Sequence, residues 1–453
     1  MKMHPFAVPF GPKSLLTACL ALLLFLPCYG EHSILEGTLE QSSVFPGTEH
    51  RYWVYVPEGY QSGQEACLFV GLDGILCGAP EVFDELISSG KMPMTIGVFI
   101  DPGKIKDGKG EVVRYNRSNE FDMTDSRFAS FLEQELLPTA EGRVLNDGRK
   151  LKFSMRASDR AIFGLSSGGI AAFNAAFCRP DMFARVFSGV GTFVAFRGGN
   201  DLQALVRKTE PLPLRIFLQD GTFDAWNALF GSWYEANRLL ESALQFAGYE
   251  LKCDWGESGH NGNRATQIFR DVMVWLWEGW PQAPQRGVTQ NDLLQPMLKD
   301  SSDWEFVGRQ KVKRRNRGTF DAVYPDGSLA VRKEEGDNNL WQYVLDEKGK
   351  PLYGQRFYWL HNMDNHALHI GPMGFDDKGF LFVVTTCGVQ ICDQNGRVRG
   401  ILRLPKATAA PVVALSIESG QLRLTDKEGN TFKRHLNIAP PQEGVRPASQ
   451  GQG

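Results

Sequence analysis

Arg160 to Ile170 read RAIFGLSSGGI. An apolar strand pattern leads into a G-x-S-x-G turn centred on Ser166, and a stretch of small residues at helical spacing follows it. This arrangement is typical of a nucleophile elbow, where a sharp strand-to-helix turn exposes a serine hydroxyl and glycines stand where a Cβ would clash. The stretch predicts an α/β fold in which Ser166 is a nucleophile.

A serine nucleophile needs a base, and the base needs an acid that orients it. His260 is the first histidine after Ser166, and it lies in a glycine-bracketed loop that follows an apolar strand pattern. The acid is expected between the two in chain order. Residues 214–219 read as a buried strand, and two aspartates follow it. We favour Asp224 over Asp220, because Asp220 directly precedes a glycine, as turn-forming residues do.

Strand and helix patterns alternate around these residues. Apolar spacing from 226 to 248 predicts an amphipathic helix that ends at Gly248. The order strand, acid loop, helix, strand, histidine loop is the βαβ progression of a doubly wound, mostly parallel sheet. The carboxyl edge of such a sheet collects the loops that carry chemistry.

Five motifs occur in order along the first half of the chain. They are YWVYVP at 52–57, LDG at 72–74, RSNEFD at 117–122, GLSSGG at 164–169 and GHN at 259–261. Together they make the segment from about 37 to 280 resemble the esterase D/enterochelin esterase-like family of α/β-hydrolases, which includes feruloyl and acetyl-xylan esterases. The resemblance implies a triad of Ser166, Asp224 and His260. It also implies an oxyanion hole made by the backbone N–H groups of Ser167 and Ile75.

The same resemblance places a charged block from Arg114 to Asp122 beside the mouth of the active site. It makes Asp73, Arg117 and Glu120 candidates for binding a polar leaving group such as a sugar. The alternative is a buried set of ion pairs that holds a loop in place, since paired charges are common where loops pack on a sheet. The sequence leaves both interpretations open.

The N-terminus is typical of a secretory signal peptide at 1–30. Lysines precede an apolar run at 15–26 that is too short to span a bilayer, and cleavage is expected after Gly30. Lipid attachment at Cys28 is the alternative, although the residues before this cysteine match a lipobox poorly. We therefore expect a secreted or periplasmic protein.

Six cysteines follow the predicted cleavage point, and an exported chain permits disulfides among them. Cys67 with Cys77 is the first pair to test. The net charge of −3 excludes a polybasic field that would bind nucleic acid or an anionic membrane. The motifs predict no cofactor, and they leave the oligomeric state open.

The pattern changes after Trp280. The segment 281–300 begins as a proline- and glycine-rich linker, and 301–438 shows short alternating strands separated by turn signals. The tail at 439–453 is rich in proline, glutamine and glycine and is predicted to be disordered. We therefore predict an α/β-hydrolase domain at 31–280 and a smaller all-β domain at 301–438.

Residues 374–383 and 388–398 resemble blades of the gluconolactonase/regucalcin-like propeller family, within a region from about 322 to 436. This length holds about three blades, so a partial propeller is expected. The family's metal-binding aspartate would fall at Gly371, which has no side-chain ligand. We predict no metal site in this region, because the group of His361, Asp364, His366 and His369 is equally compatible with a polar loop.

The sequence thus predicts an exported serine carboxylic-ester hydrolase that works through an acyl-enzyme. The family resemblance implies acetyl or feruloyl esters of carbohydrates as the substrate class. One alternative is a metal-dependent sugar lactonase in the C-terminal half, which chelation would inactivate. Another is a non-catalytic binding protein on an esterase scaffold, which would form no acyl-enzyme.

Overall fold

The computed structural model describes residues 32–311, 320–363, 368–406 and 410–447. The predicted signal peptide at 1–30 lies outside these ranges. Within them, no helix combines the length and the hydropathy that crossing a membrane requires.

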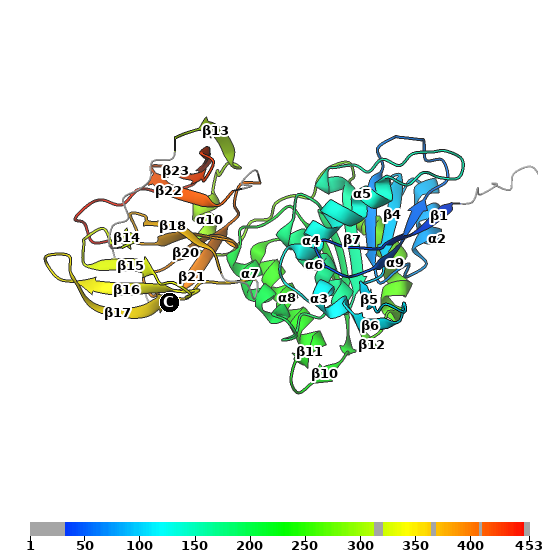
Figure 1. The fold of residues 1–453 in the computed structure, drawn as a ribbon, viewed down its shortest axis with the longest axis horizontal. Coiled ribbons are helices and arrows are strands. Elements are labelled where there is room, and N and C mark those ends of the chain that lie inside the picture. Colours follow the sequence, from blue (N-terminus) through cyan, green and yellow to red (C-terminus); the bar gives the residue numbers. More distant parts are fainter. Residues whose placement is uncertain (1–31, 312–319, 364–367, 407–409, 448–453) are drawn as a thin grey trace, which may run out of the picture.

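An eight-stranded sheet organises the N-terminal half (Figure 1). Its spatial order is β1-β2-β4-β3-β7-β8-β9-β12. Neighbours from β4 to β12 are parallel, whereas β1 and β2 join antiparallel at one edge. The strands are β1 (Ser33–Leu39), β2 (His50–Val56), β3 (Cys67–Leu72), β4 (Thr95–Ile100), β7 (Arg160–Leu165), β8 (Arg185–Gly189), β9 (Arg215–Phe223) and β12 (Glu250–Gly259). The central strands are almost continuously apolar, because both faces of the sheet are covered.

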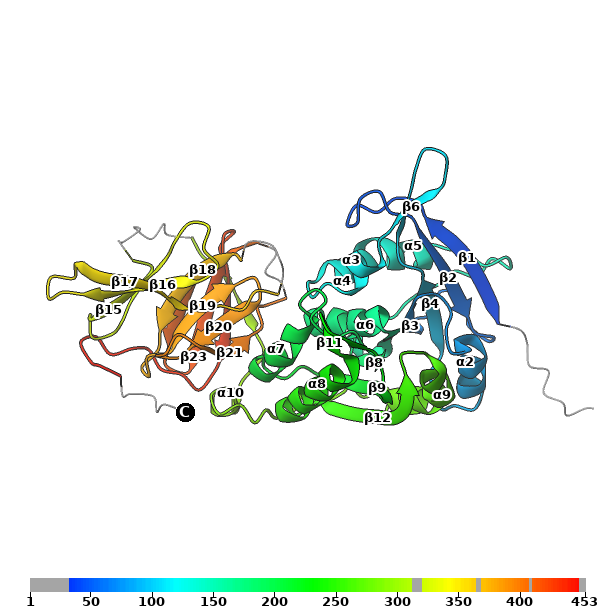
Figure 2. The ribbon, with the colours of Figure 1, turned by 90° about the horizontal axis from the view of Figure 1, so that it is seen from below.

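Helices cover both faces of this sheet (Figure 2). On one face lie α2 (Ala79–Ser88) and α9 (Asn263–Trp277), where Phe269 packs against phenylalanines of three strands. The opposite face carries α3 (Arg117–Phe121), α4 (Arg127–Phe131), α5 (Leu137–Glu141), α6 (Ser167–Cys178), α7 (Leu202–Lys208) and α8 (Trp233–Ala247). The predicted α/β architecture is therefore present, as a mixed and mostly parallel sheet between two helical layers.

The direction in which the chain crosses the sheet reverses at β3. From β3 the chain passes to β4 on one side and then returns, through α3 to α5, to β7 on the other side. The loops that leave β3 and β7 diverge at this point, and such a switch point is where open α/β sheets bind their ligands. The loops that follow β8, β9 and β12 begin at the same edge of the sheet, because these strands are parallel to β7.

The helix predicted for 226–248 begins later than expected. α8 starts after Ser232, whose side chain accepts a hydrogen bond from a first-turn N–H, and it ends at Gly248, whose φ is 77°. The preceding residues form a small hairpin of β10 (Trp226–Asn227) and β11 (Gly231–Ser232). Leu229 fits the apolar spacing of the helix but is 82% exposed in the hairpin. The helical spacing of apolar residues therefore begins, by chance, before Ser232, the residue that caps the helix.

Three four-stranded antiparallel sheets make up the described part of the C-terminal region (Figure 1). Their orders are β14-β15-β16-β17, β18-β19-β20-β21 and β13-β24-β23-β22, so the first and last strands of the region pair with each other. The strands are β13 (Glu305–Arg309), β14 (Ala322–Val323), β15 (Leu329–Lys333), β16 (Leu340–Leu345), β17 (Pro351–Tyr358), β18 (Ile370–Phe375), β19 (Leu381–Thr385), β20 (Gly388–Cys392), β21 (Val398–Leu402), β22 (Val412–Glu418), β23 (Gln421–Asp426) and β24 (Asn430–His435). An all-β region agrees with the expectation, and closure into a propeller stays a prediction.

A buried ion pair joins the two halves. Glu210, just after α7, accepts hydrogen bonds from Arg434 of β24 at 2.9 and 2.5 Å and from the Arg403 N–H at 2.7 Å. The side chains of Arg434 and Glu210 are 2% and 4% exposed. The Arg403 guanidinium also donates to the last two carbonyls of α6. The β region is thereby anchored on the helix that begins at the predicted nucleophile.

The segment 281–300, predicted to begin as a linker, packs between the halves. The Asn291 amide donates to the carbonyls of Arg207 and Arg399, one in each half. α10 (Leu294–Leu298) then buries Leu294 against strands of the β region. This connection therefore contributes to the interface as well as joining the chain.

The described part of the tail, 439–447, lies against the β region. The Gly444 N–H donates to the Pro325 carbonyl, and Arg446 pairs with Asp326 at 2.6 Å. The tail was predicted to be disordered, yet these contacts hold its first part. Residues 448–453 lie outside the described ranges.

Candidate active site

Ser166 occupies a sharp turn between β7 and α6. Its φ of 58° is in the left-handed region, which residues with a Cβ rarely adopt. Gly164 permits the turn, because a Cβ at that position would lie 2.2 Å from the carbonyl oxygen of Gly168. The Ser166 N–H donates to the Gly189 carbonyl and so ties the turn to the end of β8. These constraints present the hydroxyl at the carboxyl edge of the sheet.

Three side chains from separate loops form a hydrogen-bonded chain at this edge. Ser166 Oγ lies 2.8 Å from Nε2 of His260, and Nδ1 of His260 lies 2.6 Å from Oδ1 of Asp224. The serine follows β7, the aspartate follows β9 and the histidine follows β12. The His260 side chain is 33% exposed, whereas the Asp224 side chain is fully buried. A substrate can therefore reach the imidazole, while water is kept from its acid partner.

The surroundings of Asp224 favour its ionised form. Burial opposes ionisation, but hydrogen bonds from His260, Asp220 and the Ala225 N–H outweigh it and lower the pKa of the Asp224 carboxyl. We assign the imidazole proton to Nδ1, where this carboxylate accepts it, which leaves a lone pair on Nε2. In that tautomer His260 can accept the hydroxyl proton of Ser166.

Asp220, the alternative acid, lies within β9, and none of the hydrogen bonds of its carboxyl among the described residues involves the imidazole. Its carboxyl oxygens accept hydrogen bonds from the Gly221 N–H at 2.7 Å and from the Asn237 amide at 2.8 Å. The side chain is fully buried, and its carboxyl contacts that of Asp224. The structure thus brings Asp224 against His260 and holds Asp220 behind it.

Two residues near the nucleophile were missed by the sequence reasoning. Thr192 Oγ1 lies 3.3 Å from Ser166 Oγ and accepts a hydrogen bond from the Trp233 indole N–H at 3.2 Å. The Trp233 ring also meets the His260 ring edge-on, with centroids 5.8 Å apart. Because the threonine oxygen already accepts from the indole, its own hydrogen is free to point at Ser166 Oγ. Thr192 shortly follows β8, and this post-strand position was the signal that could have identified it.

The two N–H groups predicted to form an oxyanion hole belong to the segments that follow two neighbouring strands, β3 and β7. Ser167 is the first residue of α6, and Ile75 follows a tight turn at Asp73 and Gly74, whose φ angles are 64° and 80°. β3 and β7 are hydrogen-bonded neighbours, so both loops begin at the edge that carries Ser166. The positive end of a helix dipole at Ser167 also favours developing negative charge.

The charged block divides into an accessible pair and a buried group. Arg117 forms a bidentate pair with Asp73, with both N–O distances 2.7 Å, and it donates to the Leu165 carbonyl beside Ser166. Glu120 is 1% exposed, and its carboxylate binds His50, the Asn116 amide and the Gly103 N–H. These contacts favour the alternative for Glu120, a buried set of charges that holds a loop in place, over contact with a substrate. Asp73 and Arg117 remain candidates.

The rest of the block does not join this pair. Arg114 lies on the exposed hairpin strand β6 (Val112–Tyr115), and Asp122 is buried. Burial raises the pKa of the Asp122 carboxyl, although the hydroxyls of Ser118 and Ser167 act to lower it.

A polar pocket of about 480 Å³ opens beside the loop that carries His260. It is lined by Gly256, Glu257, Ser258, Gly259, Asn261, Asn263, Arg264 and Gln267. Hydroxyl, amide, carboxylate and guanidinium groups dominate this lining. A pocket with these groups suits a ligand that carries many hydroxyls better than an apolar one.

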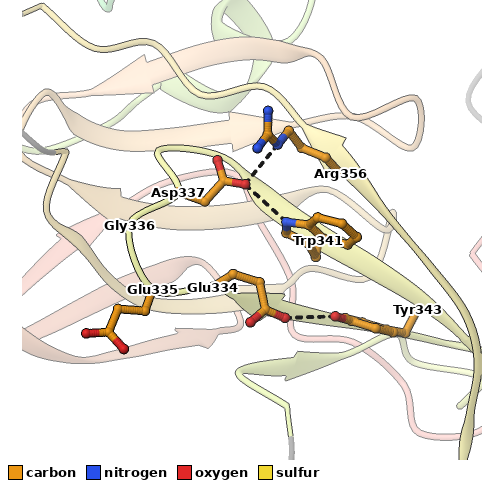
Figure 3. Close-up of a pocket in the computed structure, with 7 residues that line it drawn as sticks. All are labelled: Glu334, Glu335, Gly336, Asp337, Trp341, Tyr343 and Arg356. Carbon is orange, nitrogen blue, oxygen red and sulfur yellow. Dashed lines mark hydrogen bonds and ion pairs between the residues drawn. The ribbon is translucent and has the colours of Figure 1, made fainter.

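Another pocket, of about 400 Å³, lies on the β14–β17 sheet at the opposite end of the molecule (Figures 1 and 3). Two of its three carboxylates are paired with neighbours: Asp337 accepts from Trp341 and Arg356, and Glu334 accepts from Tyr343. This pocket shares no helix or strand with the Ser166 site.

The predicted cysteine pair is not joined. Cys67 is buried near Trp280, and Cys77 lies beside the Thr266 hydroxyl. The described residues contain no disulfide. Burial raises the pKa of the Cys67 thiol to about 12, so this group stays protonated at neutral pH.

Of the histidine group of the β region, His361 contacts the N-terminal half. His361 Nε2 lies 2.9 Å from Nζ of Lys208 in α7, and burial together with this cation lowers its pKa to about 4. Asp364 and His366 lie outside the described residues. Among the residues that are described, no group of three or more His, Cys, Asp or Glu side chains is arranged to hold a metal ion.

Comparison with known proteins finds a family match in the N-terminal half. Residues 43–258 match the sequence profile of the Esterase family, described as "Putative esterase". No curated protein sequence gives a significant match. In structure the chain is similar to a ferulic acid esterase, with 17% identity over 55% of this chain and 98% of that chain and a TM-score of 0.41.

Two further solved structures are similar to this chain. The enterobactin esterase of Shigella flexneri has 22% identity over 55% of this chain and 60% of its own, with a TM-score of 0.41. The feruloyl esterase module of Clostridium thermocellum has 13% identity over 56% of this chain and 92% of its own, with a TM-score of 0.40. This chain therefore spans 60% of the length of the enterobactin esterase.

The family match stops before the β region, where the propeller resemblance is not confirmed. It supports carboxylic-ester hydrolysis as the activity of the N-terminal half. The resemblance inferred from the ordered motifs is confirmed over residues 43–258, which match the model of the Esterase family.

Proposed function

We propose that this protein hydrolyses carboxylic esters through an acyl-enzyme on Ser166. The observation that carries the proposal is the hydrogen-bonded chain from Ser166 Oγ through His260 to Asp224, with distances of 2.8 and 2.6 Å. The serine oxygen attacks the ester carbonyl carbon while Nε2 of His260 takes the hydroxyl proton. The N–H groups of Ser167 and Ile75 hold the oxyanion that forms.

The remaining steps return the proton and release the acid. The His260 imidazolium, oriented by Asp224, gives its proton to the leaving alcohol as the carbon–oxygen bond breaks. Water then takes the place of the alcohol, His260 removes a proton from it, and the acyl group leaves Ser166 as a carboxylic acid. No step needs a cofactor.

We further propose that the alcohol is a carbohydrate, acylated with an acetyl or feruloyl group. The alcohol receives its proton from His260 and must therefore leave on the histidine side of the site. The polar pocket of about 480 Å³ adjoins that side. Its amide and guanidinium groups would hydrogen-bond sugar hydroxyls, and the Asp73–Arg117 pair offers a second polar contact beside β7.

Export is the remaining part of the proposal. A protein that acts on acylated polysaccharide meets its substrate outside the cytoplasm, and residues 1–30 have the pattern of a cleaved signal peptide. N-terminal sequencing of the exported protein should begin at Glu31. A start at Met1 would contradict this assignment.

The first experiment is hydrolysis of p-nitrophenyl acetate by the mature protein and by Ser166→Ala. The variant should lose activity by about 10⁴-fold or more, because no other nucleophile replaces the hydroxyl. Ser130→Ala removes a hydroxyl in α4 that bonds only within its own turn, and it should keep full activity. A fluorophosphonate probe should label Ser166, as located by mass spectrometry. A folded protein that neither hydrolyses nor labels would favour the binding-protein alternative.

A second experiment tests the leaving group. Asn263→Ala alters the polar pocket without touching the hydrogen-bonded chain at Ser166. It should raise KM for an acetylated xylo-oligosaccharide while p-nitrophenyl acetate is hydrolysed as before. An equal effect on both substrates would show that the pocket does not bind the alcohol.

A further inference from the structure

Two aspartates meet behind His260. Asp220, within β9, is 0% exposed, and so is the side chain of Asp224, which follows the same strand. Each carboxyl group lies close enough to shift the pKa of the other, upward for Asp220 and downward for Asp224. Two carboxylates that touch in a buried site repel each other strongly unless a proton lies between them.

One carboxylate oxygen of Asp224 has no hydrogen-bond donor among the described residues. Oδ1 accepts from the Ala225 N–H at 2.5 Å and from His260 at 2.6 Å. Oδ2 is buried and has no partner among the N–H and hydroxyl groups of the described residues. A buried carboxylate oxygen without a donor is costly, so a donor is expected at this position.

Asp220 is placed to be that donor. Its own oxygens receive the Gly221 N–H at 2.7 Å and the Asn237 amide at 2.8 Å. The Asn237 amide nitrogen has two hydrogens but three oxygens within reach, since it also faces the carbonyls of Gly191 and Trp233. Asp220 is therefore held by fewer donors than an ionised carboxylate in a buried site requires.

We propose that Asp220 is a positioning residue that carries a proton at neutral pH and donates it in a hydrogen bond to Oδ2 of Asp224. This role rests on the proposed function, because it acts through Asp224 on His260. The pair then holds a single negative charge, located on Asp224. The bound proton stays on Asp220 throughout the reaction, and the proton that moves is the one between Ser166 and His260.

The charges around the pair favour this state. Burial, followed by the hydrogen bond and charge of Asp224, raises the pKa of Asp220 far above its usual range. The only residue of α8 that hydrogen-bonds to Asp220 is the uncharged Asn237. In the sheet, Asp220 pairs with Trp255 of β12, and the Arg238 guanidinium lies over the Trp255 ring. Among the described residues, the hydrogen bonds of the Asp220 carboxyl come from the backbone and from an uncharged amide, and no cation donates to it.

A single negative charge on the Asp220–Asp224 pair allows His260 to act as a base. If both aspartates were ionised, two negative charges would hold a proton on the resting imidazole, which could then not accept one from Ser166. If Oδ2 of Asp224 had no donor, the carboxylate could turn, and Oδ1 would no longer be aimed at Nδ1. The proton on Asp220 prevents both outcomes.

The direct test measures the proton itself. The full-length protein is labelled with ¹³C at the aspartate carboxyls, and the Asp220 resonance is identified by its loss in Asp220→Asn. The proposal expects this resonance at the chemical shift of a protonated carboxylic acid at pH 7. A resonance at the position of an ionised carboxylate would overturn the proposal, whether or not the protein hydrolyses esters.

A kinetic test measures the consequence. Asp220→Asn keeps an N–H that can donate to Asp224, and kcat for p-nitrophenyl acetate should stay within about threefold of the wild-type value. Asp220→Leu has a similar volume and no donor, and kcat should fall about 10- to 100-fold with KM unchanged. Equal activities of the two variants, with matching circular dichroism, would contradict the positioning role.

Failure of the proposed esterase function and failure of the Asp220 proposal give different results. If the proposed esterase function is wrong, Ser166 takes no fluorophosphonate label in the wild-type protein, while the ¹³C spectrum still reports whether Asp220 is protonated. If the positioning proposal alone is wrong, labelling and hydrolysis proceed and the Asp220 resonance is that of an ionised carboxylate.

Discussion

The two halves of this protein build their sheets in opposite ways. In the N-terminal half the central strands are parallel and buried on both faces, with helices crossing between them. In the C-terminal region each strand turns back on its neighbour, and β17 is exposed along most of its length. The first arrangement brings distant segments to one edge, and the second mostly brings chain neighbours together.

The candidate sites of the two halves differ in the same way. Ser166 and His260 are 94 residues apart in the chain and 2.8 Å apart in space. The residues that line the pocket in Figure 3 all lie between 334 and 356, and Asp337 and Glu334 accept hydrogen bonds from other residues of the lining. A parallel sheet can therefore combine groups with different tasks, whereas this antiparallel sheet combines groups that stabilise its own turn.

The largest expected effect would locate the chemistry in the N-terminal half. Asp224→Asn should lower kcat for p-nitrophenyl acetate by about 10⁴-fold, because an amide cannot hold the Nδ1 proton of His260 in the required tautomer. Asp337→Asn, in the pocket of the β region, is the matched control and should change kcat less than twofold. The opposite pattern would move the reacting groups into the C-terminal region and favour the lactonase alternative.

The next effect concerns the contact between the halves. Arg434→Ala should lower the free energy of unfolding by about 3–5 kcal/mol, because it leaves the Glu210 carboxylate buried without its partner. Asp303→Ala removes an exposed pair with Arg286, in which the side chains are 83% and 40% exposed, and should cost less than about 1 kcal/mol. Urea unfolding followed by circular dichroism measures both. Similar losses in the two variants would mean that the halves do not depend on the buried pair.

A pH-dependent effect distinguishes the buried aspartate of the N-terminal half. Because the pKa of Asp220 is raised on folding, the native protein keeps a proton that the unfolded chain releases above about pH 4. The stability contributed by Asp220 is therefore lost as the pH rises toward its folded pKa. Asp220→Asn should gain stability over the wild type between pH 5 and 8, by up to about 1.4 kcal/mol per pH unit. A difference that is constant with pH, measured by urea unfolding, would contradict the raised pKa.

The smallest effect tests the contact between Thr192 and the nucleophile. Thr192→Val keeps the shape of the side chain but removes the hydroxyl that lies 3.3 Å from Ser166 Oγ. We expect kcat to fall about two- to tenfold, the contribution of one neutral hydrogen bond. Thr192→Ser should restore the activity, and steady-state kinetics on p-nitrophenyl acetate compares the three proteins. No difference between valine and serine would limit Thr192 to a packing role.

Much of the N-terminal fold could be predicted because its signals are local. The glycines around Ser166 mark a turn that a Cβ would block, and the apolar runs mark strands that are covered on both faces. Chain order then pointed to His260 and to the two aspartates at 220 and 224, and the structure brings His260 and Asp224 to Ser166. The start of α8 was missed, because apolar spacing continued through the hairpin before the Ser232 cap.

Other features depend on contacts that no local pattern reveals. The sequence could not tell whether Glu120 faces a ligand or a buried cluster, since its partners His50 and Gly103 come from other segments. Nor could it pair Glu210 with Arg434, which are 224 residues apart in the chain. Burial is decided by what packs above a residue, and that is known only when distant segments have met.

The sequence by itself determined the elbow at Ser166, the order of strands and helices around it, and the change to short antiparallel strands after Trp280, because backbone sterics and hydrophobic period act within a few residues. The tertiary structure alone decided which aspartate meets His260 and which one lies behind it. Both are acidic residues near the end of one strand, four positions apart. Their difference in charge state arises from their neighbours, which are a property of the folded chain.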